Sequence, residues 1–457
     1  MRFWSLAPFL LVSAYQVLAV VVRRDLPFPD EDPFYQPPSG WENEKLGTIL
    51  RTRQIDPKAI FDLDVKEAWQ LLYRTSYKSD DEPTTTVTTI VIPHNAKQDK
   101  LVVYGDFVDA NGPQCAPSYG FRDGAGEDLG FLANVALMMP YLQGGYIVTV
   151  PDKQGKINAF ASGRVEGHQT LDGIRATLNF DKLNLTDSVK VAGWGYSGGA
   201  IQIGWAASLQ PSYAPELPMV GWYYGGTPVS IPELVNTINE TVFSGFLVGG
   251  ITGLADSYPD LKDFIDKFGT KESKDAMNFA RTHCMFDIVL KYPFQNFASK
   301  KYATIDKNFL QVKVFQDVLT SLIMGRSSDE TPRVPVMMSH GKADEIAPYD
   351  SAYQAFKNWC DYGANIHFRS YSSGLAAHVI TAISDITESY KWIVDRLNGK
   401  KMASGCTESS TNDVILDTKA LGPNFEHLLG IIGGVLDGYI GPGDKILQRK
   451  IADGNLP

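Results

Sequence analysis

Residues Ser188–Leu209 read SVKVAGWGYSGGAIQIGWAASL, and this stretch decides the fold. A short apolar run at Val189–Ala192 leads into the G-x-S-x-G pattern Gly195–Gly199, after which small and apolar residues continue at helical spacing. The order of strand, tight turn and helix is the context of a nucleophile elbow, in which a serine sits on a strained turn at the top of a sheet. Flanking glycines remove the side chains that would clash there. The stretch predicts Ser197 as a nucleophile, with the backbone N–H of Gly198 pointing at the oxyanion.

The same letters allow two other interpretations. Gly193, Gly195 and Gly198 also spell G-x-G-x-x-G, the dinucleotide-binding pattern, which normally opens the first βαβ unit and precedes an acidic residue at the end of the next strand. Here the pattern lies in the middle of the chain, and the next strand candidate, Val220–Tyr224, ends in two glycines. The other alternative is a glycine-rich turn without chemistry, because a five-residue pattern recurs by chance. The rest of the chain has to decide between them.

The composition is that of a globular, acidic chain. It has 457 residues, of which 44% are hydrophobic and 21% charged, with a net charge of −10. This length allows one large domain with an insertion, or two domains. The negative charge argues against nucleic acid as a partner, since nucleic-acid binding needs a basic surface. Contact with a neutral lipid–water interface is compatible with it, because that attraction is apolar.

The N-terminus predicts a secreted protein. Residues 1–19 have the features of a signal peptide: a positive start at Met1-Arg2, a mostly apolar run at Phe3–Val12, and small residues for cleavage at Val17–Ala19. The alternative is a retained membrane anchor, for which the stretch is short and interrupted by polar residues. Arg23-Arg24 offers a second, dibasic processing point.

Secretion changes how the cysteines and two asparagines are interpreted. In an oxidising route the four cysteines are expected to form disulfides, with three pairings open. They are Cys115, Cys284, Cys360 and Cys406. None has C-x-x-C spacing, which disfavours a zinc or redox site. Asn184 and Asn239 begin glycosylation sequons, which are usable where they are exposed.

Expected strands and helices alternate on both sides of the elbow. The β-branched stretch Thr84–Pro93 and the apolar Lys100–Tyr104 are predicted to form an antiparallel pair. Further expected strands are Tyr146–Val150, Val334–Ser339 and Asn365–Tyr371, and further expected helices are Leu129–Leu142, Thr170–Asn179, Tyr353–Trp359 and Thr387–Leu397. The alternation predicts an α/β fold with a mainly parallel sheet. Residues 25–45, rich in Pro and acidic residues, predict an extended arm.

The alternation stops after Pro228. The following residues contain helix-like and irregular segments, including the apolar, glycine-rich Val242–Leu254. This piece is either a buried helix packed through its glycines or a mobile apolar cap over an active site, and the two are compatible if the cap packs on the core when closed. The predicted organisation is a signal peptide at 1–19, a first part of the core at 20–227, a cap or lid insertion at 228–332, and a second part of the core with a C-terminal flap at 333–457.

A serine nucleophile needs a base, and the base must be oriented by an acid. In hydrolases with an elbow, the acid and then the histidine follow the serine along the chain. His367 lies inside an alternating strand and His427 opens an apolar tail helix, so both are expected outside the site. His378 ends the small-residue loop Gly374–His378 between a strand and a helix, where a base is expected. A loop-packing role is its alternative.

The acid is expected in the loop after the strand at Val334–Ser339. Asp344 comes first after the small residues of that loop, and Glu345 is the near competitor. The alternative role for Asp344 is a helix N-cap. Ser197, Asp344 and His378 occur in the chain order and local context of a catalytic triad, which favours catalysis over separate structural roles for each.

Five motifs together resemble the fungal secretory lipase family. They are GYSGGA at Gly195–Ala200, CAPSY at Cys115–Tyr119, SYAPEL at Ser212–Leu217, GGTPVS at Gly225–Ser230 and DEIAPY at Asp344–Tyr349. The combination is far more specific than G-x-S-x-G, and it covers most of the mature chain. The resemblance implies an α/β-hydrolase fold with a helical cap inserted after the Gly-Gly-Thr-Pro turn. It also implies Ser197 as nucleophile, Asp344 as acid and His378 as base.

The resemblance extends to other residues. It implies a second oxyanion donor from the aspartate six residues before the Cys of CAPSY, which is Asp109, beside the backbone N–H of Gly198. It implies the disulfide pairs Cys115–Cys284 and Cys360–Cys406, and a tail flap at about Leu428–Ile440. One departure is local: Gly-Leu-Ala-Ala precedes His378, where a Glu stands before the His in a relative. It bears on the electrostatics near the base, not on its identity.

These observations predict a secreted serine lipase or esterase. It would hydrolyse the carboxylic ester bonds of triacylglycerols through an acyl-enzyme on Ser197, with water or another alcohol releasing the acyl chain. No metal or cofactor is required, and no stable protein partner is implied. The alternatives on the same fold are a serine peptidase and a non-lipolytic carboxylesterase. A non-catalytic lipid-binding protein is disfavoured because all three candidate catalytic residues are present.

Overall fold

The structure is a computed structural model that describes residues 26–59, 63–77, 82–123, 129–305 and 311–414. The predicted signal peptide at 1–19, the dibasic Arg23-Arg24, His427 and the tail flap at Leu428–Ile440 lie outside the described residues. No helix in the described part of the chain is both long enough and apolar enough to span a bilayer.

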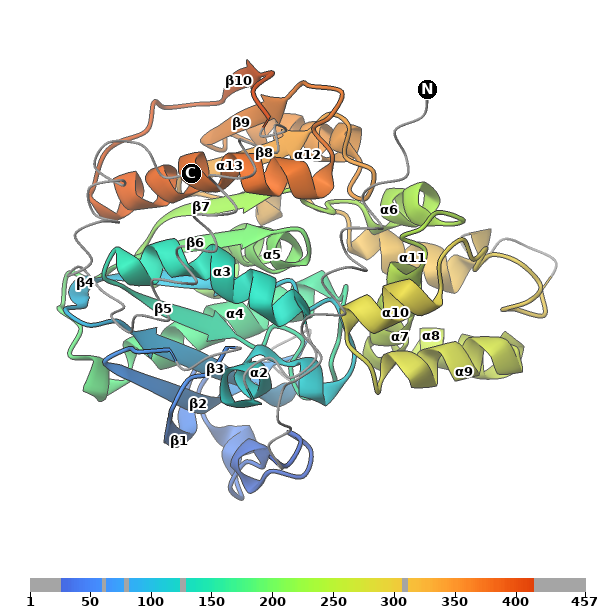
Figure 1. Ribbon diagram of the computed structural model, residues 1–457, viewed down its shortest axis with the longest axis horizontal. Helices are drawn as coiled ribbons and strands as arrows, with labels where there is room; N and C mark the ends of the chain where they lie inside the picture. Colours follow the sequence, from blue (N-terminus) through green and yellow to red (C-terminus); the bar gives the residue numbers. More distant parts are fainter. Residues whose placement is uncertain (1–25, 60–62, 78–81, 124–128, 306–310, 415–457) are drawn as a thin grey trace.

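A ten-stranded sheet forms the centre of the molecule, in the order β1-β2-β3-β5-β4-β6-β7-β8-β9-β10 (Figure 1). The strands are β1 (Ile49–Ile55), β2 (Glu67–Ser76), β3 (Pro83–Ile92), β4 (Lys97–Gly105), β5 (Tyr146–Pro151), β6 (Lys190–Tyr196), β7 (Met219–Gly225), β8 (Val336–Gly341), β9 (Ile366–Tyr371) and β10 (Thr407–Thr411). From β5 to β10 neighbouring strands are parallel, whereas β1, β2, β3 and β5 pair antiparallel. The mainly parallel sheet therefore carries an antiparallel edge.

The predicted antiparallel pair of Thr84–Pro93 and Lys100–Tyr104 is wrong. Both stretches are strands, β3 and β4, but β5 lies between them. β3 pairs antiparallel with β5, and β4 pairs parallel with it. Every residue of β5 is buried. An apolar strand buried on both faces belongs inside a sheet, and here that preference wins over pairing between neighbours in sequence.

Helices cover both faces of the sheet (Figure 1). One face packs against α4 (Gly163–Leu178), α5 (Gly198–Tyr213) and α12 (Tyr349–Asp361), and the other against α2 (Pro117–Asp123), α3 (Leu129–Gln143) and α13 (His378–Leu397). Alternate residues of β4 pack into the two hydrophobic cores, because successive side chains of a strand point to opposite faces of the sheet. Leu101 and Val103 belong to the core under α4 and α5, while Val102 and Tyr104 belong to the other.

The segment that connects β7 to β8 contains helices and no named strand among its described residues. It contains α6 (Ile231–Ile238), α7 (Gly245–Ser257), α8 (Pro259–Phe268), α9 (Lys271–Ala280), α10 (Met285–Lys291) and α11 (Lys313–Ser321). In Figure 1 these helices gather on the right, beside the sheet. A mixed sheet flanked by helices, with a helical insertion after the seventh strand, confirms the predicted α/β-hydrolase fold.

Other parts differ from the sequence-based expectation. Residues 26–45 are not a free extended arm, since they form two short 3-10 turns at Pro33–Tyr35 and Trp41–Asn43. Asp32 ties this region down through Arg53, at 2.6 Å, and Arg122, at 2.7 Å. Strands β1, β2 and β10 were not predicted, and α4 and α13 begin earlier than expected, at Gly163 and His378.

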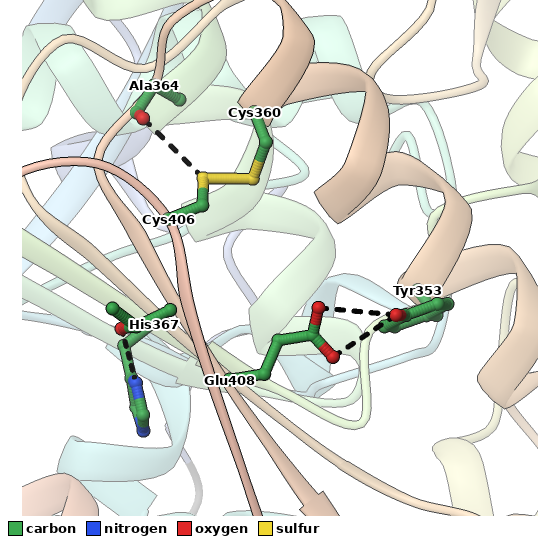
Figure 2. Close-up of a disulfide and its surroundings, with 7 residues drawn as sticks. Tyr353, Cys360, Ala364, His367, Cys406 and Glu408 are labelled. Carbon is green, nitrogen blue, oxygen red and sulfur yellow. Dashed lines mark hydrogen bonds between the residues drawn. A yellow bond between two sulfur atoms is a disulfide. The ribbon is translucent and has the colours of Figure 1, made fainter.

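Two disulfides join distant parts of the chain. Cys115, in the loop before α2, pairs with Cys284 at the start of α10 and so links the helical segment to the core. Cys360, on α12, pairs with Cys406 next to the edge strand β10, where Glu408 also accepts a hydrogen bond from Tyr353 (Figure 2). These are the pairs that the family resemblance implies.

Reduction of the disulfides should lower stability, because each bridge restricts the unfolded chain and contributes about 2–4 kcal/mol. The Cys115–Cys284 bridge spans 169 residues and the Cys360–Cys406 bridge 46. Paired Cys→Ala replacement of the first should therefore lower the free energy of unfolding by about 1 kcal/mol more than replacement of the second. Urea unfolding of both variants measures this, and a melting curve unchanged by a strong reductant would contradict it.

Candidate active site

The serine predicted as nucleophile lies on a strained turn between β6 and α5. Ser197 has φ +54° and ψ −122°, a conformation rarely adopted by residues other than glycine. At this turn, the backbone at the ends of β4 and β6 passes close to the first turn of α5. A Cβ on Gly195 would lie 2.3 Å from the carbonyl oxygen of Gly199, and a Cβ on Gly105 would lie 2.6 Å from the same oxygen. Glycine is therefore required where β4, β6 and α5 meet.

The structure brings the three residues predicted as nucleophile, acid and base into one chain of hydrogen bonds. His378 Nε2 lies 2.8 Å from Ser197 Oγ. Its other ring nitrogen, Nδ1, lies 2.8 Å from Asp344 Oδ2. Ser197 precedes α5, Asp344 follows β8, and His378 is the first residue of α13. Three separate connections thus converge at the carboxyl end of the parallel strands.

Neighbouring groups hold the backbone of His378 in place. The Glu345 carboxylate accepts a hydrogen bond from the backbone N–H of His378 at 2.9 Å, and the Tyr196 hydroxyl donates to the carbonyl of His378 at 2.9 Å. Of the two acidic candidates, Asp344 therefore contacts the ring and Glu345 holds the backbone. An acidic side chain at a helix N-terminus is also favoured by the helix dipole.

The pKa of Asp344 lies below its usual value, and the pKa of His378 lies above its own. Burial would raise the pKa of Asp344, but the charge and hydrogen bond of His378 and the backbone N–H of Ile346 outweigh it and hold that pKa below its usual value. Burial would lower the pKa of His378, but Asp344 and then Glu345 raise it above its ordinary value. The arrangement stabilises a carboxylate beside an imidazole that can accept a proton.

Asp109 lies directly against the turn. Its backbone has φ +40°, and a Cβ on Gly198 would lie 1.7 Å from Asp109 Oδ1, so the carboxyl group occupies the space beside the Gly198 backbone. Asp109 is buried, and burial raises the pKa of its carboxyl group. The two oxyanion candidates named by the sequence are thus adjacent to Ser197 and to each other.

The sequence reasoning missed two buried charged residues behind Asp109. The Nζ of Lys153 donates to the carbonyl oxygen of Gly198 at 2.6 Å. It lies 3.4 Å from Glu166 Oε2 and 3.6 Å from Asp109 Oδ1. No local motif marks Lys153 or Glu166, and only their complete burial sets them apart from surface charges.

An apolar cavity opens above Ser197. At its floor are Ser197, Gly198 and Asp109, and its walls come largely from the helical segment. The wall residues from α6, α7, α8 and α11 are Ile231, Leu234, Val235, Ile238, Phe246, Leu247, Gly250, Ile251, Leu254, Leu261, Phe315 and Leu319. A second apolar cavity within the helical segment shares Ile251 and Phe315 with the first.

The other residues singled out in the sequence lie elsewhere. His367 bonds to Thr407 and Ser409 between the strands β9 and β10, away from Ser197. Asn184 is exposed, whereas the side-chain oxygen of Asn239 accepts a hydrogen bond from the backbone of Phe297 at 3.0 Å. Within the described ranges, no group of three or more His, Cys, Asp and Glu side chains is arranged to hold a metal ion.

Comparison with known proteins shows the family of this chain. The family model described as "Secretory lipase" matches residues 129–405. The secreted triacylglycerol lipase LIP2 of Malassezia globosa is 50% identical over 98% of this chain and 99% of its own length. The secreted triacylglycerol lipase LIP1 of Malassezia furfur is 43% identical over 98% of this chain and 91% of its own.

A solved structure is similar to this chain over most of its length. The X-ray structure of Candida antarctica lipase A superimposes with a TM-score of 0.78 at 31% identity, covering 89% of this chain and 95% of that one. The chain belongs to the secretory lipase family.

Proposed function

We propose that this protein is a secreted triacylglycerol lipase that uses Ser197 as nucleophile, His378 as general base and Asp344 as the orienting acid. The observation that carries the proposal is the hydrogen-bonded chain from Ser197 Oγ through the imidazole to Asp344 Oδ2. The names of the Malassezia relatives, secreted triacylglycerol lipases, support the substrate and the secretion. The proposal calls for a lipid–water interface and for no stable protein partner.

In the first step, Ser197 Oγ attacks the carbonyl carbon of an ester while His378 Nε2 takes the hydroxyl proton. Asp344 accepts the hydrogen bond from Nδ1–H, holds this tautomer and stabilises the imidazolium that forms. The imidazolium then returns the proton to the leaving alcohol, and an acyl-enzyme remains. A water molecule, activated by the same imidazole, releases the fatty acid and restores Ser197.

The negative charge on the carbonyl oxygen needs donors at the moment of attack. We assign this role to the backbone N–H of Gly198 and to the carboxyl group of Asp109, which lie side by side next to Ser197. Removal of one such donor typically lowers kcat by about 10²–10³-fold.

The apolar cavity gives the acyl chain a place to bind, and we propose that residues 228–332 act as the cap that forms it. Most wall residues are aliphatic or aromatic and come from this segment. Burial of each methylene of an acyl chain is worth roughly 0.8 kcal/mol, which corresponds to about a fourfold gain in affinity. The second cavity, reached past Ile251 and Phe315, would extend the room for a long chain.

Replacement of the nucleophile tests the assignment directly. Ser197→Ala should lower kcat/KM for triacylglycerols and for p-nitrophenyl esters by about 10⁴-fold or more, because no other group can form the acyl-enzyme. It should also abolish covalent labelling by a fluorophosphonate, with the circular dichroism spectrum unchanged. Ser212→Ala, at the exposed end of the same helix α5, is the matched control and should keep both properties. Near-normal activity of Ser197→Ala would exclude the mechanism.

The pH dependence follows from the groups around the base. Catalysis needs a neutral imidazole, and the pKa of His378 is raised, so kcat/KM should increase with pH through a midpoint above the ordinary value of 6.5. Glu345→Gln keeps an oxygen that accepts the His378 N–H but removes a negative charge, so this midpoint should move down by about 0.5–1 unit. Asp350→Asn, exposed at the start of α12, is the control. An unchanged midpoint in Glu345→Gln would contradict this account of the electrostatics.

Chain-length preference tests the role of the cavity. For soluble p-nitrophenyl esters, kcat/KM should rise from acetyl towards longer acyl groups, by up to about fourfold per methylene. Leu234→Trp, in the α6 wall, should lower the ratio of long-chain to short-chain rates because it fills the cavity. Leu290→Trp, at an exposed position on α10 outside the cavity lining, should leave that ratio unchanged. Equal ratios in both variants would show that acyl chains bind elsewhere.

A further inference from the structure

Three buried ionisable groups form one cluster behind the turn at Ser197. Lys153 and Glu166 are completely buried, and Asp109 is 6% exposed. They come from separate parts of the chain: Asp109 from the loop after β4, Lys153 from the loop after β5, and Glu166 from the first turn of α4. The ammonium group lies 3.4 Å from Glu166 Oε2 and 3.6 Å from Asp109 Oδ1, with its short hydrogen bond going to the Gly198 carbonyl.

The charges of this cluster do not balance if every group ionises. One lysine cation faces two carboxyl groups, and an unbalanced buried charge is expensive. The low-cost state therefore has one carboxylate paired with Lys153 and one carboxyl group that keeps its proton. Burial raises the pKa of Glu166 to about 7 and also raises the pKa of Asp109, so a retained proton is expected at neutral pH.

The hydrogen bonds favour the proton on Asp109. Glu166 Oε1 accepts the backbone N–H of Ala161 at 3.1 Å, and Lys153 lies closer to Glu166 than to Asp109. Ala161 has φ +66°, a strained conformation that persists only where surrounding contacts enforce it, and this hydrogen bond is one such contact. Asp109 Oδ1 and Glu166 Oε2 are both buried without a hydrogen-bond partner, and of the two Asp109 Oδ1 lies farther from the ammonium group of Lys153. A neutral carboxyl group tolerates such a position better than a carboxylate.

The negative charge that develops on the substrate carbonyl oxygen also favours a proton on Asp109. A negative charge next to Asp109 disfavours a second negative charge on that carboxyl group. Protonated Asp109 can donate its O–H to the oxyanion, whereas ionised Asp109 would repel it.

We propose that Lys153 and Glu166 are positioning residues: the Glu166 carboxylate takes up the charge of Lys153, and this leaves Asp109 as a neutral acid that donates to the oxyanion. The proton stays on Asp109 throughout and is shared with the oxyanion only as a hydrogen bond. The inference rests on the proposed role of Asp109. Lys153 in addition holds the first turn of α5 in place through the Gly198 carbonyl.

The other titratable groups near the cluster are His378, Asp106 and Asp152. His378 faces Asp109 across the site, and the charge of its protonated imidazole lowers the pKa of Asp109. Asp106 accepts a hydrogen bond from Asn134, and Asp152 accepts two from Ser118, so both carboxyl groups are held by other partners.

Glu166→Gln tests the proposal because it removes one negative charge and little volume. Lys153 is then left with Asp109 alone, so the pKa of Asp109 should fall. The alkaline side of the pH profile of kcat, where Asp109 loses its proton, should move to lower pH by about 1 unit or more. Above that midpoint kcat should fall by up to about 10²-fold, with KM changed much less. Lys153→Met, which removes the cation instead, should move the same limb to higher pH.

Asp109→Asn provides a background in which the effect has to vanish. The amide donates an N–H at every pH, so the alkaline limb assigned to Asp109 should disappear in the single variant. Adding Glu166→Gln to it should then cause no further pH shift. This variant tests the proposal even if Glu166→Gln alone fails to fold.

A structural control separates positioning from general damage. Asp172→Asn removes another buried carboxylate of α4, one that bonds to Thr75 and Arg175 instead of the cluster. It should lower the melting temperature and leave both limbs of the pH profile in place. If Glu166→Gln behaves in the same way, or if Asp109→Asn keeps the native alkaline limb, the inference is overturned. Fluorophosphonate labelling of Ser197 in these variants would show that the proposed function stands independently.

Discussion

The close packing of three backbone segments is the constraint on which the site depends. The carbonyl of Gly199, in the first turn of α5, lies where Cβ atoms on Gly105 and Gly195 would have to be. This contact joins the ends of β4 and β6 to α5, on either side of Ser197 with its positive φ. Such strain costs of order 1–3 kcal/mol, and it persists because the sheet and helices on both sides over-determine the turn.

Two carboxyl groups near the same serine have opposite environments, and this difference supports the roles proposed for them. Asp344 accepts hydrogen bonds from the His378 ring and from the backbone N–H groups of Ile346 and Ala347, so its charged form is stabilised. Asp109 is equally enclosed, but one of its oxygens has no hydrogen-bond partner. Neighbouring groups lower the first pKa, and burial raises the second. Such divergence is what the proposed roles require, with Asp344 as a charged orienting acid and Asp109 as a neutral donor.

The sequence could predict whatever is encoded locally. The elbow around Ser197 is one continuous stretch, and chain order was enough to select Asp344 and His378 as candidates. The position of β5 was not predictable from neighbouring strands, because pairing inside a sheet is decided by burial on both faces. Likewise α13 begins at His378, nine residues before the expected start, because Glu345 from a distant loop caps its first turn.

Lys153 and Glu166 show the limit of such reasoning most clearly. In the sequence they look like ordinary surface charges, and their spacing of 13 residues carries no motif. Their meaning comes only from meeting Asp109, which is supplied by a third segment.

The chemistry of the cavity also argues for an ester of a fatty acid over a peptide as the substrate. Among the described lining residues, Asp109 and Ser197 supply the polar side chains, and the wall from the helical segment is apolar. A peptide entering this wall would bury backbone N–H and C=O groups without partners, each at a cost of about 1–3 kcal/mol. An acyl chain has no such groups, and every buried methylene adds to its binding. In the proposed mechanism, Ser197 could attack the carbonyl carbon of an ester or of a peptide. The preference between these two substrates therefore has to come from the cavity wall. In the proposed function, the apolar wall from the helical segment therefore selects which carbonyl compounds can reach Ser197.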